Sequence, residues 1–175
     1  MSLRLTGNEP VFDSRQACIL GLLTATIPVM KPERVVLAAD HAGFPLKERI
    51  KSFLQGKGID TVDVGTFSEE AVDYPAIMRK GAAAVLEYGC PGIVFGGSGN
   101  GEAMASNKVR GIRCALVYSE ETARLARAHN DANMMSMGGR LTKPKDAEKY
   151  VDVFLSTDFE EGRHLKRVND LEGGR

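Results

Sequence analysis

Residues 93–102 read Ile-Val-Phe-Gly-Gly-Ser-Gly-Asn-Gly-Glu, an apolar run that breaks into a glycine-rich turn and then reaches a carboxylate. The apolar residues predict a short buried strand. The glycines let the backbone turn sharply and bring several N–H groups close to a bound anion or oxyanion. Glu102 falls where the next helix begins. The stretch therefore indicates a site for proton chemistry on a small anionic molecule, at the end of a buried strand.

Apolar runs alternate with helical patterns on both sides of this turn. The segment 45–55, for example, places Leu46, Ile50 and Leu54 on one helical face. The expected strands are 34–39, 59–64, 93–95, 112–118 and 133–137, and the expected helices are 45–55, 75–88, 102–108, 119–129, 145–155 and a charged tail at 160–170. Such alternation is typical of a parallel sheet covered on both faces. We therefore expect a Rossmann-like three-layer α/β/α sandwich with a five-stranded parallel sheet and a C-terminal helical tail.

Polar segments follow most of these strands. They are Asp40–Gly43, Gly65–Tyr74, Gly96–Glu102 and Gly138–Arg140. Doubly wound sheets bind ligands beyond the carboxyl ends of their strands. All of these segments are therefore expected to open onto one edge of the sheet and to form the site there.

The bulk composition argues against large charged partners. The 175 residues include 23 basic and 23 acidic side chains, so no long-range field favours nucleic acid or a membrane surface. Trp is absent and aromatic residues are few, which also disfavours base stacking. Cys18, Cys90 and Cys114 form no CxxC pair or disulfide framework. This usage is typical of reduced thiols, so we expect a cytoplasmic protein.

The first 32 residues differ from the rest and are expected to be an N-terminal extension. Their apolar run, Cys18–Met30, is too short to span a bilayer and follows mixed charges rather than a basic region. Met30 stands just before the first expected strand, so we take it as the hypothetical natural start. Residues 33–170 then form one domain, long enough for a core of its own.

The candidate catalytic side chains each have a plainer alternative. Glu102 suits a general base, but glutamates are also common in the first turn of helices, where the dipole stabilises them. The amides of residues 97–101 suit an oxyanion hole or, equally, a phosphate-binding turn, and no Lys-Ser/Thr follows as in a Walker loop. For His129, the sequence leaves both a catalytic and a structural role open. Asp40 orients a substrate or caps its own loop.

Three arginines are candidates for holding an anion. Arg163 and Arg167 are four residues apart, so on a helix they would share one face and could grip a phosphate together with Arg140. The alternative is a solvated basic face. The three histidines are far apart in sequence and no HExxH or paired-carboxylate motif is present, so we expect no metal site.

Seven separate motifs occur in order between about residues 33 and 170. They are Asp40-His41-Ala42-Gly43, Val72-Asp73-Tyr74-Pro75, residues 96–102, Asn107-Lys108, residues 126–133, Gly138-Gly139-Arg140 and Gly162-Arg163-His164-x-x-Arg167. Together they resemble the ribose-5-phosphate isomerase B family, which also includes galactose-6-phosphate and allose-6-phosphate isomerases.

The resemblance implies an enzyme that interconverts aldose and ketose phosphates through a cis-enediol, without cofactor or metal. It implies that His129 opens the sugar ring with help from Asp40, and that Glu102 carries the proton between C1 and C2. Ser98 and the amides of 97–101 would stabilise the enediolate. The implied substrate-binding residues are His41, Arg140, Arg163 and Arg167 for the phosphate, Tyr74 and Asn130 for the sugar, and Gly97, Gly99, Asn100 and Gly101 for the reacting end.

The identity of the base varies within this family. Many members carry a cysteine where this chain has Gly97 and use its thiolate. A second subgroup has glutamate at the position of Glu102. The resemblance places this chain in the glutamate subgroup.

The resemblance also implies a homodimer or tetramer whose sites lie between subunits, so that the C-terminal arginines of one chain serve the other's site. The expected substrates are ribose 5-phosphate and ribulose 5-phosphate. The alternatives are a sibling isomerase for hexose 6-phosphates or tetrose phosphates, and a phosphosugar-binding module without catalytic activity.

Overall fold

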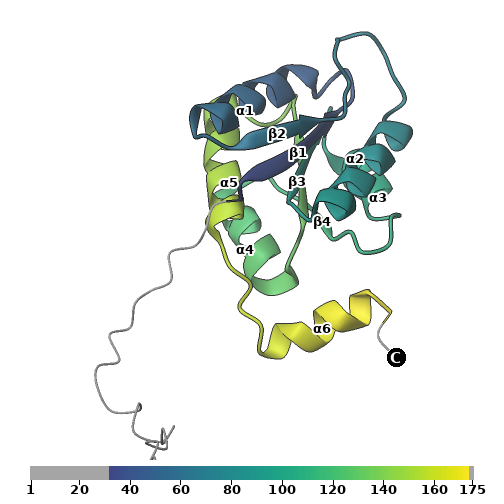
Figure 1. Ribbon diagram of the computed structural model, residues 1–175. Helices are drawn as coiled ribbons and strands as arrows, with labels where there is room; N and C mark the ends of the chain where they lie inside the picture. The colour runs from purple at the N-terminus through teal and green to yellow at the C-terminus, as the bar shows by residue number, and fades with distance from the viewer. Residues whose placement is uncertain (1–31, 174–175) are drawn as a thin grey trace, which may run out of the picture.

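The computed structural model describes residues 32–173, so the expected extension 1–32 and its hypothetical start at Met30 lie, apart from Pro32, outside the described residues. Five strands form one parallel sheet in the order β2-β1-β3-β5-β4 (Figure 1). The strands are β1 Arg34–Ala39, β2 Asp60–Asp63, β3 Gly92–Gly96, β4 Cys114–Leu116 and β5 Met134–Gly138. The helices are α1 Phe44–Gly56, α2 Tyr74–Tyr88, α3 Asn100–Ser106, α4 Glu120–Asn130, α5 Pro144–Ser156 and α6 Arg163–Leu171. The Rossmann-like fold expected from the sequence is confirmed.

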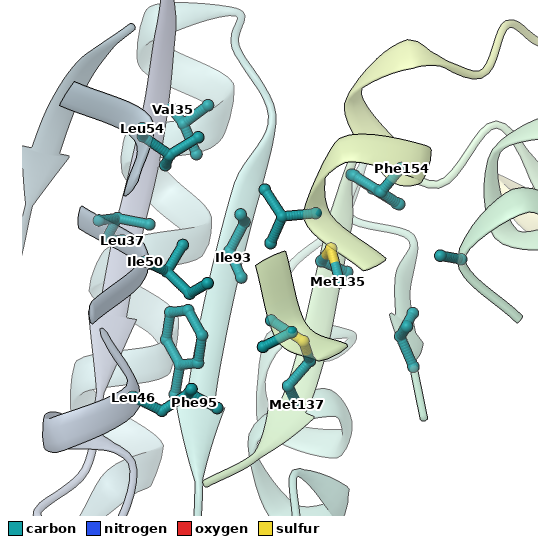
Figure 2. Packing of buried hydrophobic residues seen from close by; sticks show 14 of the residues in the cluster. Val35, Leu37, Leu46, Ile50, Leu54, Ile93, Phe95, Met135, Met137 and Phe154 are labelled. Carbon is teal, nitrogen blue, oxygen red and sulfur yellow. The ribbon is translucent and has the colours of Figure 1, made fainter. Parts of the chain in front are cut away.

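Two apolar clusters hold the helices to the sheet and make three layers. On one face, α1, α4 and α5 pack on the sheet in one cluster, in which Ile50 of α1 lies on the side of Phe95 of β3 and Phe154 of α5 on the side of Met135 of β5 (Figure 2). On the other face, α2 and α3 pack through residues such as Met78 and Ala103. Each fully buried Ile or Phe contributes about 1.5–3 kcal/mol of burial energy. The apolar periods of the sequence therefore mark the inner faces of these helices.

Two expected boundaries differ from the structure. Helix α3 begins at Asn100 rather than Glu102, because Gly99 takes a left-handed conformation (φ +82°) directly before it. Strand β4 has three residues instead of the expected seven, because it lies at the sheet edge and pairs with β5 only over Cys114–Leu116. The chain then turns into α4, where Ser119 and Thr122 form a reciprocal capping box.

The order of the strands places β1, β3 and β5 next to one another in the sheet. Helix α1, which follows β1, and helix α3, which follows β3, lie on opposite faces. The connections therefore diverge between these two strands, which is where open α/β sheets bind ligands.

A buried ion pair fixes the end of β2. Lys47 of α1 is fully buried and donates to Asp63, which also accepts from Lys51 at 2.8 Å and from the Gly65 N–H at 3.1 Å. Burial works to raise the pKa of Asp63, but these donors outweigh it, so the pKa lies below its ordinary value. The pair anchors the segment that leads from β2 towards α2.

Helix α6 packs against α4, beyond the amino edge of the sheet (Figure 1). Among residues 32–173, no helix has both the length and the apolar character needed to cross a membrane.

Candidate active site

A cavity of about 520 Å³ opens at the carboxyl edge of the central strands. It is lined by Asp40 after β1, by Gly97, Ser98, Gly101 and Glu102 after β3, by Arg140 and Leu141 after β5, and by Tyr74 at the start of α2. Except for Leu141, every lining residue is a candidate from the sequence. Leu141 is 75 % exposed and carries no sequence signal beyond its place next to Arg140.

The glycine turn is bound to the loop after β5. The Gly139 N–H donates to the Gly96 carbonyl at 2.7 Å, and the buried Ser136 hydroxyl donates to the Gly99 carbonyl at 2.7 Å. A Cβ at Gly99 would lie only 2.9 Å from the carbonyl carbon of Met137. Glycine is therefore needed at 99 both for its backbone angle and for space, and the turn is held in one position above the sheet.

Ser98 and Asn100 bind each other within this turn. The Ser98 hydroxyl oxygen accepts from the backbone N–H and from the side-chain amide of Asn100, both at 3.3 Å. Ser98 lines the cavity, and its hydroxyl donates no hydrogen bond to another described residue, so its proton is available to a bound molecule.

Glu102 is the buried carboxyl group of the cavity. It is 4 % exposed and lies in the first turn of α3. Burial raises the pKa of Glu102, and the charge of Asp40 raises it further, while its own N–H and that of Gly99 oppose the rise. A carboxyl group whose pKa moves towards neutrality is suited to take and return a proton.

Gly96 provides the space in which this carboxyl group lies. A Cβ built on Gly96 would fall 2.0 Å from Cδ and 2.0 Å from Oε1 of Glu102. A Cβ on Gly97 would instead lie 3.6 Å from Arg140 Nη1 and 3.7 Å from Ala42 Cβ. A base that takes the place of the Glu102 carboxylate in other members of the family would therefore have to be the side chain of residue 96. The expectation that the family's thiolate corresponds to Gly97 does not fit this geometry, because residue 97 points towards the loop after β5.

The two described cysteines are poor candidates for a base. Burial raises the pKa of Cys114 to about 12. Burial also raises the pKa of Cys90, which lies before β3, away from the cavity. Neither thiol is ionised near neutral pH. Ser106 lies one helical turn after Glu102, and its hydroxyl is buried without a hydrogen-bond partner among the described residues.

Backbone contacts hold Asp40 and Tyr74 of the cavity, and also His41, which follows Asp40 but does not line the cavity. Asp40 accepts from the Gly43 N–H at 2.8 Å, so it caps its own loop as well as facing the cavity. His41 accepts from the Val72 N–H at Nδ1, at 3.4 Å. Tyr74 lies over Gly101, where a Cβ would be 2.7 Å from the ring.

Four predicted site residues lie at the opposite edge of the sheet. Helix α4 runs antiparallel to the strands and carries His129 and Asn130 in its last turn, just before β5 begins. Arg163 and Arg167 are exposed on α6, which packs against α4. The five residues of β5 separate this edge from the cavity by about 16 Å. One chain alone therefore does not bring these four residues to Glu102.

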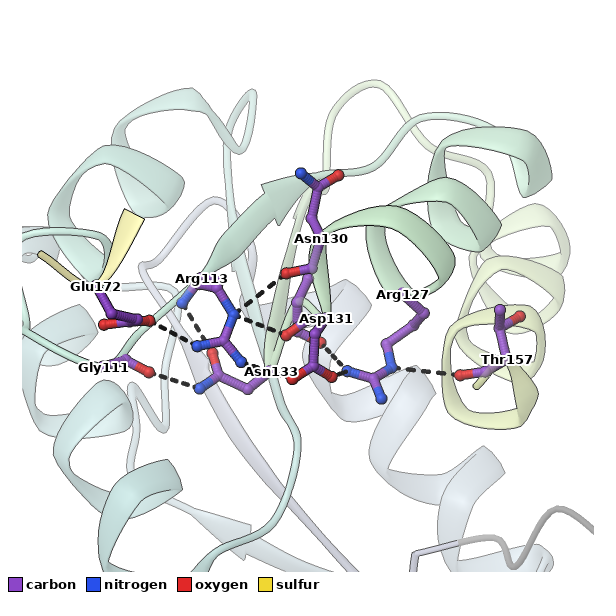
Figure 3. Close-up of polar contacts among 9 residues, drawn as sticks. Gly111, Arg113, Arg127, Asn130, Asp131, Asn133, Thr157 and Glu172 are labelled. Atoms are coloured by element: carbon purple, nitrogen blue, oxygen red, sulfur yellow. Dashed lines mark hydrogen bonds and ion pairs between the residues drawn. The ribbon is translucent and has the colours of Figure 1, made fainter. Parts of the chain in front are cut away.

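A network of ion pairs fixes the end of α4. Asp131 has a left-handed backbone (φ 43°) and binds Arg113 and Arg127, each at 2.9 Å (Figure 3). Arg113 Nε also donates to the Asn130 carbonyl at 3.2 Å, while the Asn130 side-chain amide points away from the network (Figure 3). Asn130 is thus held by its backbone and keeps its side chain free.

Known proteins resemble this chain over nearly all of the described residues. A model of the ribose/galactose isomerase family matches residues 35–171. The ribose-5-phosphate isomerase B of Mycobacterium leprae is 47 % identical over 145 residues, which cover 81 % of this chain and 90 % of that protein. The same enzyme of Mycobacterium tuberculosis is 45 % identical over 145 residues, with the same coverage.

Solved structures agree with the sequence comparisons. The ribose 5-phosphate isomerase of Thermotoga maritima superposes with a TM-score of 0.78 at 45 % identity, over 80 % of this chain and 97 % of that one. Ribose-5-phosphate isomerase B of Mycoplasma genitalium, solved with bound ribulose 5-phosphate, gives 0.76 at 37 % identity, over 80 % and 94 %. The chain belongs to the ribose/galactose isomerase family.

Proposed function

We propose that this chain is an aldose–ketose isomerase that needs no cofactor and interconverts ribose 5-phosphate and ribulose 5-phosphate through a cis-enediol. The observation that carries the proposal is Glu102, a buried carboxyl group with a raised pKa in a cavity that the glycine turn also lines, through Gly97, Ser98 and Gly101. Relatives that carry the name of this enzyme are 45–47 % identical to the chain. The free thiols of Cys90 and Cys114 suit a cytoplasmic enzyme.

The reaction moves one proton between two carbons. Glu102 takes the proton from C2 of the open-chain aldose. The electrons of the broken C2–H bond form the C1=C2 double bond, and O1 gains a proton. The resulting enediol loses the proton of O2 and receives the carbon proton from Glu102 at C1, which gives the ketose. Ser98 moves the hydroxyl proton, and the amides of 97–101 stabilise the negative charge on the oxygens.

The site is completed by a second copy of the chain. One chain supplies Asp40, His41, Tyr74 and Arg140 around the sugar and its phosphate. The partner supplies His129 and Asn130 at the ring, and Arg163 and Arg167 at the phosphate. The separation of these two groups to opposite edges of one chain supports a two-fold dimer, because symmetry then forms two identical sites from both edges.

An isomerase assay on ribose, allose, galactose and erythrose phosphates tests the reaction and its substrate range. Wild-type protein should turn over ribose 5-phosphate best, and Glu102→Gln should lower both turnover and exchange of the C2 proton with solvent deuterium to a small residual rate. Glu120→Gln is the matched control, since Glu120 is an exposed glutamate in the first turn of another helix. Full turnover by Glu102→Gln would refute the base, and a preference for a hexose phosphate would favour the sibling isomerase. Sugar-phosphate binding without proton exchange in the wild type would favour the binding module.

The role of the arginines is tested by Arg163→Ala. Loss of a charge-assisted contact of about 1.5–3 kcal/mol should raise KM for ribose 5-phosphate roughly 10- to 100-fold. Lys166→Ala removes another exposed cation from α6 and serves as the control. An unchanged KM in Arg163→Ala would mean that Arg163 lies on a solvated face and does not bind the phosphate.

A further inference from the structure

His129 belongs to a cluster with two ionisable side chains that the mechanism above does not use. The potential ligand atoms of His129, Glu160 and His164 lie within 4.8 Å of one another. The rings of the two histidines are stacked, with centroids 4.2 Å apart and planes 8° from parallel. Nε2 of His129 is 3.5 Å from Oε2 of Glu160. The cluster joins the last turn of α4 to the first turn of α6 and to the segment before it.

A metal ion does not suit this cluster. Imidazole nitrogens bind metals in the plane of the ring, and two stacked, parallel rings direct their lone pairs along separate planes rather than to one point. Arg163 donates from Nε to Nε2 of His164 at 3.2 Å, and Arg163 and Arg167 both bring positive charge to His164. The arrangement instead suits control of the orientation and protonation of one imidazole.

We propose that Glu160 and His164 are positioning residues that hold the His129 ring ready for proton transfer to the sugar. Glu160 has a contact on each side, because its N–H donates to the Ala128 carbonyl at 2.9 Å and its Oε1 lies 3.8 Å from Arg124 Nη1. Its other oxygen then faces Nε2 of His129 and favours the proton on that nitrogen. The lone pair of Nδ1 remains for the substrate. The inference rests on the proposed function, which places His129 at the sugar ring.

His164 acts through its flat, neutral ring. It is 7 % exposed, whereas His129 is partly exposed. Desolvation lowers the pKa of His164, and the charges of His129, Arg163 and Arg167 lower it further, although the charge of Glu160 opposes this in part. A neutral ring can stack on His129 without repelling it when His129 is protonated. The stack restricts rotation of the His129 ring, and a general acid–base group depends on such alignment.

The chemistry of the two sugars separates ring opening from proton transfer at carbon. Ribose 5-phosphate is mainly a closed ring and must be opened before Glu102 can act. Ribulose 5-phosphate cannot close such a ring, because its O5 carries the phosphate. Exchange of its C1 proton with solvent therefore needs Glu102 but not His129. Loss of the positioning residues should be visible only when the reaction starts from ribose.

The experiment compares both measurements in the full-length protein. Glu160→Gln and His164→Ala should lower turnover of ribose 5-phosphate about tenfold or more, out of the 10²–10⁴-fold that general acid–base catalysis supplies. Deuterium exchange at C1 of ribulose 5-phosphate should stay at the wild-type rate. His164→Phe should retain more turnover than His164→Ala, because it keeps a flat ring in the stack. Glu161→Gln is the matched control, since Glu161 is exposed and adjacent to Glu160.

Each part of the proposal has a result that would overturn it. If Glu160→Gln turned over ribose 5-phosphate as fast as Glu161→Gln, or lost C1 exchange in the same proportion as turnover, the positioning role would be overturned. Equal loss in His164→Phe and His164→Ala would overturn the role of the stack. Absence of C1 exchange in the wild type would contradict the proposed function itself.

Discussion

Replacing Gly96 by alanine should inactivate the enzyme by moving one carboxyl group. A Cβ at this position would lie 2.0 Å from Oε1 of Glu102, whereas ordinary van der Waals contact begins at 3.4 Å, so the carboxylate must retreat by about 1.4 Å. The atoms in the way are the end of a flexible side chain, so the fold should survive the substitution. A misplacement of about 1 Å in a catalytic group costs on the order of 10²-fold in rate. This corresponds to about 2.7 kcal/mol in the activation barrier.

The assay is a double-mutant cycle on kcat for ribose 5-phosphate. Gly96→Ala alone should lower kcat about 10²-fold, while in the Glu102→Gln background it should cause no further loss, because both changes act on the same group. Gly56→Ala is the control, since a Cβ there would meet nothing within 4 Å. The reasoning fails if Gly96→Ala keeps most of the wild-type kcat, or if the two losses multiply.

Three further predictions concern stability and reactivity. Asp63→Asn should cost about 3 kcal/mol in urea unfolding at pH 7, because Lys47 stays buried without its main partner. Because the pKa of Asp63 is lowered in the folded protein, its contribution to the free energy of unfolding is present above the unfolded value of 3.8 and is lost as the pH falls below it. Asp63→Asn should therefore flatten the fall in stability at acid pH. An unchanged fall would contradict the ion pair between Asp63 and Lys47. Asn107→Ala removes two hydrogen bonds to the backbone of Cys114, at 2.7 and 2.8 Å. It should lower the free energy of unfolding by about 2 kcal/mol in the same measurement. An unchanged stability would mean that these bonds do not hold β4 in place. Peptide mapping after iodoacetamide treatment at pH 8 should find Cys90 alkylated well before Cys114, whose pKa is about 12, and equal rates would show that Cys114 is not buried.

The fold could be read from the sequence because its signals are local. The apolar periods of 45–55 and 75–88 and the continuous apolar strands each concern one element. The order of the strands has no such signal, since it depends on which face each crossover helix takes. The shortness of β4 likewise follows from its place at the sheet edge.

The candidate site was predictable in composition but not in arrangement. The motifs identified Glu102 and Ser98, which the structure places in one cavity. They did not reveal that His129 lies at the opposite edge, because that depends on the direction of α4 relative to the sheet. Nor did they distinguish Gly96 from Gly97, since adjacent residues differ only in the direction of a side chain that neither possesses. The approach of Glu160 to His129 also has no sequence signal, because 31 residues separate them along the chain.

The claim that each site combines Glu102 of one chain with His129 of its partner is tested most directly by mixed dimers. Two inactive chains, Glu102→Gln and His129→Asn, are co-expressed with different affinity tags, and the doubly tagged species is isolated. In a dimer with shared sites, one site carries both lesions and the other carries neither, so the account predicts about half of the wild-type turnover of ribose 5-phosphate per dimer. An inactive doubly tagged dimer would contradict the account, because each chain would then supply both groups to its own site.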